Sequence, residues 1–307
     1  MSVFPKHTQV SNTPLGIGYM LMAVSLFGVM DALVKWLGAS YPTVQIMFFR
    51  SFCAFPPILL MVLRSSGGTQ NFWAVLRPTS IAGLSIRSVF GCISMALFFY
   101  AYQFLSLADV TAISFAAPIF IACMSVWLLQ ERVGPHRWSA IIVGFIGMLV
   151  ILRPGEGMLS SGALIVVAAT LFYALAIIQI RKLSRTEPAT SIAFWYAAFC
   201  TAVTGLLLPF FWVTPDLEGL VLLVITGLIG GCAQLCMTRA YGLAPASVAA
   251  PFDYTHLIWS VVIGWYVWGD FPDIHTWIGC AIVIASGLYI LWRETVKRTP
   301  VPPLVTE

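Results

Sequence analysis

Long apolar runs separated by short polar turns fill almost the whole chain. A helix needs about 20 apolar residues to cross the hydrocarbon core of a bilayer, and ten runs come close to that length or exceed it. Their approximate limits are 15–37, 41–63, 80–104, 110–130, 136–152, 161–183, 188–212, 219–241, 246–268 and 274–292. The pattern predicts an all-α integral membrane protein with ten transmembrane helices.

One stretch of this pattern occurs twice. The run from Leu105 to Arg132 begins with a short polar turn, continues with apolar residues broken by Pro118, and ends in an acidic and a basic residue. The same scheme returns from Leu243 to Asp270, where Pro251 breaks the run. Three positions match in sequence, namely Leu105, Ala108 and Val110 with Leu243, Ala246 and Val248. The repetition predicts two homologous halves, 15–152 and 161–292.

Five helices in each half is an odd number, so the second half must enter the membrane upside down relative to the first. Inverted repeats of this kind are a common architecture of secondary carriers, which bind substrate and ions at broken helices near the bilayer midplane. The proline-broken helices are therefore the places where we expect the substrate.

Composition agrees with a membrane protein. The chain has 307 residues, of which 60% are apolar and 9% are charged, and its mean hydropathy is +0.92. So few charges cannot cover a water-soluble domain of this size. The lipid bilayer is thus the expected partner, and the net charge of +4 does not indicate nucleic-acid binding.

The seven cysteines all fall within predicted spans and form no disulfide framework. Cys232 and Cys236 lie one helical turn apart, which indicates packing more than metal binding. We expect no metal site and no cofactor.

Basic residues predict the orientation, because lysine and arginine accumulate in cytoplasmic loops. With the N-terminus in the cytoplasm, the outer side receives two basic residues, Lys35 and Arg153. The inner side receives twelve: Lys6, Arg64, Arg77, Arg132, Arg137, Arg181, Lys182, Arg185, Arg239, Arg293, Lys297 and Arg298. This partition predicts that both termini are cytoplasmic.

Enzyme motifs such as a glycine-rich phosphate loop, HExxH or a serine-nucleophile elbow do not occur in the sequence. The candidate chemistry lies instead in polar residues within the apolar spans, where a charged side chain needs a partner or a wet cavity. Our candidates for substrate binding or gating are Asp31, Arg50, Arg87, Ser114, Gln234, Asp253, Tyr254, His256 and Trp259. For the ionisable residues, structural ion pairs and direct substrate contact both remain open.

Depth along the helices suggests how these charges pair. At 1.5 Å per residue, Arg87 and Asp253 both lie about 6–8 Å to the cytoplasmic side of the midplane, while Asp31 and Arg50 lie to the outer side. We therefore expect an inner pair, Arg87 with Asp253, which contributes to closing the cytoplasmic side when the carrier faces out, and an outer pair, Asp31 with Arg50. Asp31 and Lys35 are one turn apart, which also allows a local pair, although Lys35 is more simply expected to reach the outer interface.

The chain resembles the drug/metabolite transporter superfamily, EamA type, from about Leu15 to Trp292. The likeness is carried by the runs ADVTAISFAAPIFIACMSVWLLQERVGPHRWSAIIVGFIGMLVILRPG and APASVAAPFDYTHLIWSVVIGWYVWGD. Two motifs are similar to those of a subgroup that includes riboflavin and S-adenosylmethionine importers. They are Arg87 before the run GxxSMALFFYA, and the run PFDYT from Pro251 to Thr255. The resemblance implies a ten-helix carrier of the bacterial inner membrane, with a central cavity lined by the first, third, fourth, sixth, eighth and ninth helices.

The expected function is secondary transport of a small polar, ring-containing metabolite by alternating access. Riboflavin is the first choice, because aromatic side chains such as Tyr254 and Trp259 suit a flat ring. S-adenosylmethionine import and export of amino acids or opine metallophores are the alternatives within the family. An integral-membrane enzyme acting on lipid-linked substrates is the disfavoured alternative of another class, since clustered carboxylates or histidines at one interface are missing. A homodimer is left open.

Overall fold

The computed structural model describes residues 13–65, 72–117, 119–121, 124, 135–152, 161–184, 186–243 and 250–296. All regular elements within these ranges are helices. They are α1 (Thr13–Leu37), α2 (Thr43–Phe52), α3 (Phe55–Ser65), α4 (Phe72–Leu76), α5 (Ile81–Ala101), α6 (Leu107–Ser114), α8 (Pro135–Leu152), α9 (Ser161–Leu183), α10 (Ala189–Leu207), η2 (Leu208–Phe210), α11 (Leu217–Leu243), η3 (Ala250–Thr255), α13 (His256–Trp268) and α14 (Ile274–Val296).

Six helical segments in the described ranges are long and apolar enough to cross a membrane. They are Pro14–Leu37, Thr43–Arg64, Ile81–Ala101, Gly162–Ile180, Ala189–Phe210 and Leu217–Tyr241. Shorter apolar helices include Ile142–Ile151 and Ile274–Tyr289. An all-helical, multi-pass membrane protein is therefore confirmed, whereas the count of ten spans and the cytoplasmic termini stay predictions.

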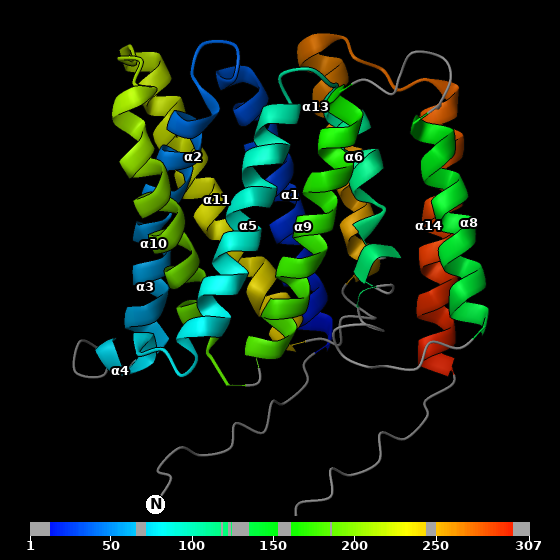
Figure 1. Ribbon diagram of the computed structural model, residues 1–307, viewed down its shortest axis with the longest axis horizontal. Coiled ribbons are helices and arrows are strands. Elements are labelled where there is room, and N and C mark those ends of the chain that lie inside the picture. The colour runs from blue at the N-terminus through cyan, green and yellow to red at the C-terminus, as the bar shows by residue number, and fades with distance from the viewer. Residues whose placement is uncertain are drawn as a thin grey trace, which may run out of the picture.

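The helices stand side by side in one bundle (Figure 1). α2, α3 and α10 form one flank of the bundle, and α8 and α14 form the other. Between them, α1 packs along α11 and α5 packs along α9. The start of α1, the short helix α4 and the last turns of α14 lie at the same end of the bundle (Figure 1). We call this the α4 end and the other the opposite end.

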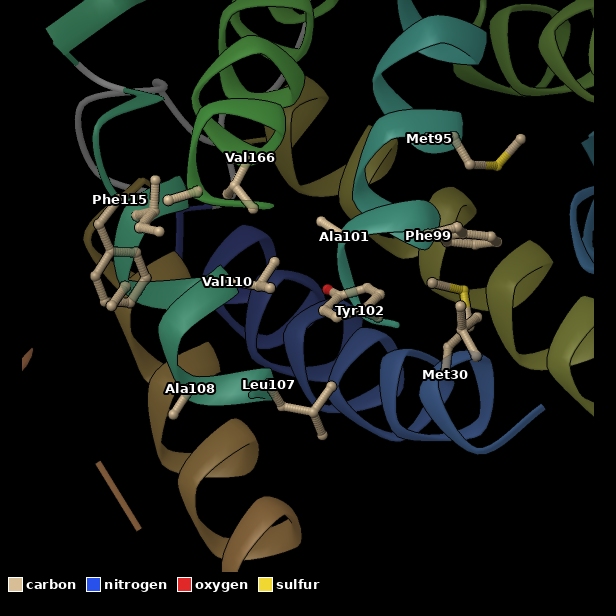
Figure 2. Packing of buried hydrophobic residues seen from close by; sticks show 14 of the residues in the cluster. Met30, Met95, Phe99, Ala101, Tyr102, Leu107, Ala108, Val110, Phe115 and Val166 are labelled. Carbon is tan, nitrogen blue, oxygen red and sulfur yellow. The ribbon is translucent and has the colours of Figure 1, made fainter. Parts of the chain in front are cut away.

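The largest apolar cluster lies where α1, α5, α6 and α9 meet. Figure 2 shows its packing: Met30 on α1 points toward Phe99 on α5, Met95 lies further along α5, and Tyr102 sits beside α1. Fully buried side chains of α6 and α9, such as Val110 and Val166, continue the cluster. Apolar side chains therefore fill the centre of the bundle, and each polar group placed there needs a local partner.

Prolines interrupt two of the predicted spans. α2 ends at Phe52 and α3 begins at Phe55, followed by Pro56 and Pro57, which lack the backbone N–H that a continuous helix would use. In the ninth predicted span, the segment Ala250–Thr255 around Pro251 is a 3₁₀ helix that leads into α13. The predicted break at Pro251 is confirmed, whereas Pro118 lies outside the described residues.

Glycines on α11 allow a close approach of α2 and α3. A Cβ atom on Gly227 would strike Cys53 and lie 2.5 Å from the Phe49 carbonyl oxygen. A Cβ atom on Gly231 would lie 2.8 Å from both Ala54 Cα and Pro57 Cγ. Small residues at such positions allow helix backbones to pack closely in membranes. Gly227 and Gly231 are four positions apart in the sequence, a spacing that predicts close helix packing, and the structure confirms it.

This contact gives a first prediction. Gly227→Ala should lower the thermal unfolding midpoint of the purified protein, because the added methyl forces α2 and α11 apart at a cost of about 1–3 kcal/mol. Gly18→Ala on α1 is the matched control, since a Cβ atom there meets nothing within 4 Å and alanine is the better helix former. A Gly227 variant as stable as the Gly18 variant would contradict the tight packing.

Candidate substrate-binding site

Two buried arginines share one tyrosine ring in the bundle. The Arg87 guanidinium carbon on α5 lies 3.9 Å from the centre of the Tyr196 ring on α10. The corresponding carbon of Arg50 on α2 lies 5.6 Å from the same ring. Arg50 and Arg87 are each only 4% exposed, and Tyr196 is 5% exposed. We call these three residues the arginine cluster.

Glycines make room for the arginine cluster. A Cβ atom on Gly91 would collide with Nη1 of Arg87 and lie 2.9 Å from Cε2 of Tyr196. On α11, a Cβ atom on Gly230 would lie 3.2 Å from Nε of Arg50. The guanidinium groups therefore occupy space that larger residues at these two positions would fill.

The cluster carries charge without a counter-ion among the described residues. Neither arginine has a carboxylate within ion-pair distance in the part of the chain that the structure describes. The atoms Nε and Nη1 of Arg87 and Nε of Arg50 are buried without a hydrogen-bond partner there. A cation–π contact contributes about 2 kcal/mol when desolvated, whereas an uncompensated buried charge costs several kcal/mol. Tyr196 alone does not offset this cost.

Asp31 has partners on two other helices. Its carboxylate lies 3.3 Å from Nε2 of His256 on α13, with both side chains mostly buried. The contact is at ion-pair distance but lacks hydrogen-bond geometry. The Tyr102 hydroxyl, at the end of α5, also hydrogen-bonds to Asp31. Asp31 thus joins α1 to α13 and α5 near the centre of the bundle.

Neither predicted arginine–aspartate pair forms among the described residues. Asp253 accepts a hydrogen bond from the Tyr241 hydroxyl at 3.2 Å, and Asp31 faces His256 and not Arg50. Counting residues from the middle of each span predicted similar depths in the membrane for the paired charges. It could not predict which side of each helix faces which neighbouring helix. The inner and outer pairs are therefore wrong for this structure.

The remaining candidates take mixed positions. Ser114 donates a hydrogen bond to the Thr111 carbonyl at 2.7 Å. Gln234 is 5% exposed and its Nε2 is buried without a partner, one helical turn from Gly230. Tyr254 packs its ring edge-to-face with Phe115, with 5.0 Å between the centroids.

The side chain of Trp259 begins against α1, because a Cβ atom on Gly28 would lie 2.7 Å from Cβ of Trp259. Trp259 is 39% exposed, so it does not belong to the buried centre. In this structure Tyr254 and Trp259 make packing contacts, and whether either also stacks on a substrate ring stays a prediction.

The end of the bundle opposite α4 carries its own polar ties between the two halves of the chain. Lys35 forms an ion pair with Asp270 at 3.0 Å and lies 5.0 Å from the centre of the Trp268 ring. The local pair of Lys35 with Asp31 is therefore wrong. Gln45 is bonded twice to the backbone of Val213, at 2.8 and 2.9 Å.

Asp216 contributes another tie at this end. It accepts hydrogen bonds from the Gly219 backbone N–H at 3.0 Å and from the Tyr41 hydroxyl at 2.9 Å. These two donors hold the pKa of the Asp216 carboxyl below its usual value. Asp216 thus stays charged, and it fixes the start of α11 against the segment before α2.

Sequence reasoning missed Tyr196 and Glu187. Tyr196 lies well inside an apolar span, seven residues from the start of α10. A phenolic hydroxyl at that depth needs a polar partner, and this was the signal in the sequence that could have identified it. Glu187 is 4% exposed and its carboxylate accepts the backbone N–H groups of Thr79 and Ser80 at the start of α5. The negative charge there suits the positive end of the helix dipole.

A buried hydroxyl contact was also missed. Thr111 on α6 and Ser260 on α13 lie 2.7 Å apart. Within the described ranges, histidine, cysteine, aspartate and glutamate form no group of three or more that could hold a metal ion. The polar groups in the centre thus include hydrogen-bond donors, acceptors and two cations, which is a set suited to binding a polar solute.

The fold and these buried polar groups define a helical membrane protein of the transporter class. A model of the EamA-like transporter family matches residues 14–153 and again residues 160–292. The chain belongs to the EamA-like transporter family, and the resemblance found in the sequence is confirmed.

Curated relatives align over nearly their full length. The S-adenosylmethionine uptake transporter of Rickettsia bellii (strain RML369-C) is 29% identical over 281 residues, which cover 91% of this chain and 94% of the relative. The riboflavin transporter of Rhizobium johnstonii is 27% identical, covering 92% and 93%. The pseudopaline exporter CntI of Pseudomonas aeruginosa is 28% identical, covering 88% and 94%.

A solved structure described as "Crystal structure of protein" shares the fold. It superposes with a TM-score of 0.64 at 17% sequence identity, covering 94% of this chain and all of the other. At this identity the likeness concerns the fold alone.

The partners seen for Arg87 and Asp253 give a second prediction. The single variants Arg87→Asp and Asp253→Arg should each lose substrate uptake, and the double variant should recover none of it. The reason is that Arg87 lies next to Tyr196 and Asp253 next to Tyr241, so the two residues are not partners. Uptake into proteoliposomes, with protein amounts matched after size-exclusion chromatography, is the measurement. Recovery in the double variant would mean that the two residues meet in another conformation of the transport cycle.

Proposed function

We propose that the protein is a secondary transporter of the bacterial inner membrane that moves a small polar metabolite by alternating access. The observation that carries this proposal is the arginine cluster, which places two charged donors inside a helical membrane bundle with no counter-ion in the described part of the chain. Such groups are costly in lipid and mark the pathway of a solute in many membrane proteins.

We further infer two inverted five-helix repeats, 15–152 and 161–292. Two findings support them. The family model matches twice, once in each half. In addition, the two most extensive pairings between the halves are α1 with α11 and α5 with α9. In the proposed repeats α1 corresponds to α9, and α5 corresponds to α11. The two pairings are therefore equivalent under the symmetry of the repeats. Inverted repeats supply two alternating conformations by rocking one half against the other.

The names of the relatives offer three candidate substrates. S-adenosylmethionine, riboflavin and pseudopaline are each named for a protein about equally similar to this chain. Riboflavin was the first choice on the basis of aromatic residues. The Tyr254 ring packs against Phe115, and Trp259 starts against α1 and is 39% exposed. Because the arginines instead have donors without a partner among the described residues, we place S-adenosylmethionine first.

Reconstitution tests the transporter class. The purified protein is placed in liposomes loaded with unlabelled S-adenosylmethionine or riboflavin, and entry of the labelled compound is followed. Saturable uptake that depends on the internal compound means a carrier. Formation of a new product would indicate an enzyme instead, and flux that does not saturate would indicate a channel.

The orientation leads to a third prediction. Ser40 and Arg77 are exposed and lie at opposite ends of the predicted spans. Single cysteines are introduced at these positions in a background without native cysteines. An impermeant maleimide should react with Ser40→Cys from outside the cell and with Arg77→Cys from the cytoplasmic side. Labelling of both from the same side would contradict the ten-span topology.

The ion pair between α1 and the end of α13 gives a fourth prediction. Alternating access requires Lys35 and Asp270 to separate when the carrier opens outward. A bifunctional methanethiosulfonate linker between Lys35→Cys and Asp270→Cys should stop uptake, and a reducing agent should restore it. Each single cysteine variant treated with the same linker is the control. Full uptake in the cross-linked protein would show that this contact does not move.

A further inference from the structure

We propose that Arg50 and Arg87, over the ring of Tyr196, bind a carboxylate group of the transported substrate. This inference rests on the proposed function and makes it more specific. It ranks candidate substrates that have a carboxylate above a flavin, which is neutral at physiological pH. The argument depends on the donors, their burial and the occupation of the nearby acids.

The donors are available and protected from solvent. Arg87 keeps Nε and Nη1 unpaired and Arg50 keeps Nε unpaired, all within the described residues. Both side chains are more than nine-tenths buried. Guanidinium groups form strong, charge-assisted hydrogen bonds with carboxylates and remain protonated even when buried. Three unpaired nitrogen atoms around one ring therefore define a site for an anion.

The protein's own carboxylates are engaged elsewhere. Asp31 is held by His256 and Tyr102, Asp253 by Tyr241, and Glu187 accepts two backbone N–H groups at the start of α5. No described acidic residue comes within ion-pair distance of either arginine. Among the described residues no protein group supplies the missing negative charge, and a metabolite with a carboxylate would neutralise part of the cluster when it binds.

Glycines and Tyr196 position the two guanidinium groups. The side chains of Arg87 and Arg50 lie so close to Gly91 and Gly230 that a Cβ atom there would collide with Nη1 of Arg87 or lie 3.2 Å from Nε of Arg50. The Tyr196 ring lies within 3.9 Å and 5.6 Å of the two guanidinium carbons and so holds both groups on one platform. A compact, monovalent group with two acceptor oxygens matches three donors better than a phosphate, whose additional oxygens would be left without partners.

The test compares ligands that differ in one carboxylate. Full-length protein in lipid nanodiscs is unfolded by heat, with tryptophan fluorescence as the readout. The probes are S-adenosylmethionine against its decarboxylated form, and acetate against acetamide, each pair at equal concentration. Sodium chloride and sodium phosphate at matched ionic strength are the inorganic comparisons. The variants are Arg87→Met, Arg87→Lys and, as the control, Arg64→Gln at the exposed end of α3.

The proposal predicts a carboxylate-dependent rise of the unfolding midpoint in the wild type and in Arg64→Gln. Both Arg87 variants should lose this rise, and the affinity for the carboxylate probe should fall by at least about tenfold, as expected for a lost charged hydrogen bond. Without any probe, Arg87→Met should unfold at the same temperature as the wild type or higher, because the variant removes an uncompensated buried charge.

Other results overturn the proposal. A wild type that shows no difference within either probe pair has no carboxylate site. Equal shifts with chloride or phosphate mean that an inorganic anion occupies the cluster. If Arg87→Met is less stable than the wild type yet keeps the carboxylate effect, Arg87 is only structural. Should that variant fail to fold, Arg87→Lys decides, since it keeps the charge and loses the planar donors.

Failure of the proposed function has a different signature. A carboxylate-dependent midpoint shift without saturable uptake would refute the carrier and leave the binding site. Saturable uptake of riboflavin that is insensitive to Arg87→Lys would support the carrier and reject the carboxylate site.

Discussion

The contact of Arg87 and Arg50 with the ring of Tyr196 brings together three helices that are far apart in sequence, α2, α5 and α10. Charge burial in an apolar bundle is expensive, so this contact constrains its surroundings. Gly91 and Gly230 must stay small beside it, and the neighbouring acids are held by other groups. The guanidinium groups of the arginine cluster thus lack a carboxylate partner among the described residues, and the proposed function depends on these two positive charges.

The remaining polar ties work at the ends of the bundle. At the end opposite α4, Lys35 pairs with Asp270 and Gln45 with the Val213 backbone. At the α4 end, the Glu187 carboxylate accepts the N–H groups before α5, and Arg239 donates to the Tyr19 hydroxyl at 3.2 Å. Each tie joins one half of the chain to the other half. In the proposed transport cycle, movement between the halves breaks contacts at one end while the other end holds.

Much of the fold could be predicted from local sequence alone. The apolar runs predicted where helices lie, Pro251 predicted the break that became a 3₁₀ segment, and the spacing of Gly227 and Gly231 predicted close packing. These features depend on backbone chemistry within one helix or on one face of it. The family resemblance was confirmed by matches in both halves.

The pairing of side chains could not be predicted in the same way. Height along a helix follows from counting residues, but the partner depends on how each helix is rotated and tilted. Asp31 therefore faces His256 and not Arg50, and Lys35 faces Asp270, which is 235 positions away. Tyr196 was missed because the local sequence around it does not show that two arginines from other helices lie near its ring.

An experimental structure of the protein with its transported substrate bound tests the central claim most directly. The account predicts a substrate carboxylate at charge-assisted hydrogen-bond distance, about 2.7–2.9 Å, from both Arg87 and Arg50, with the two guanidinium groups still next to the Tyr196 ring. A substrate bound elsewhere, with both guanidinium groups still lacking an anionic partner, would contradict it.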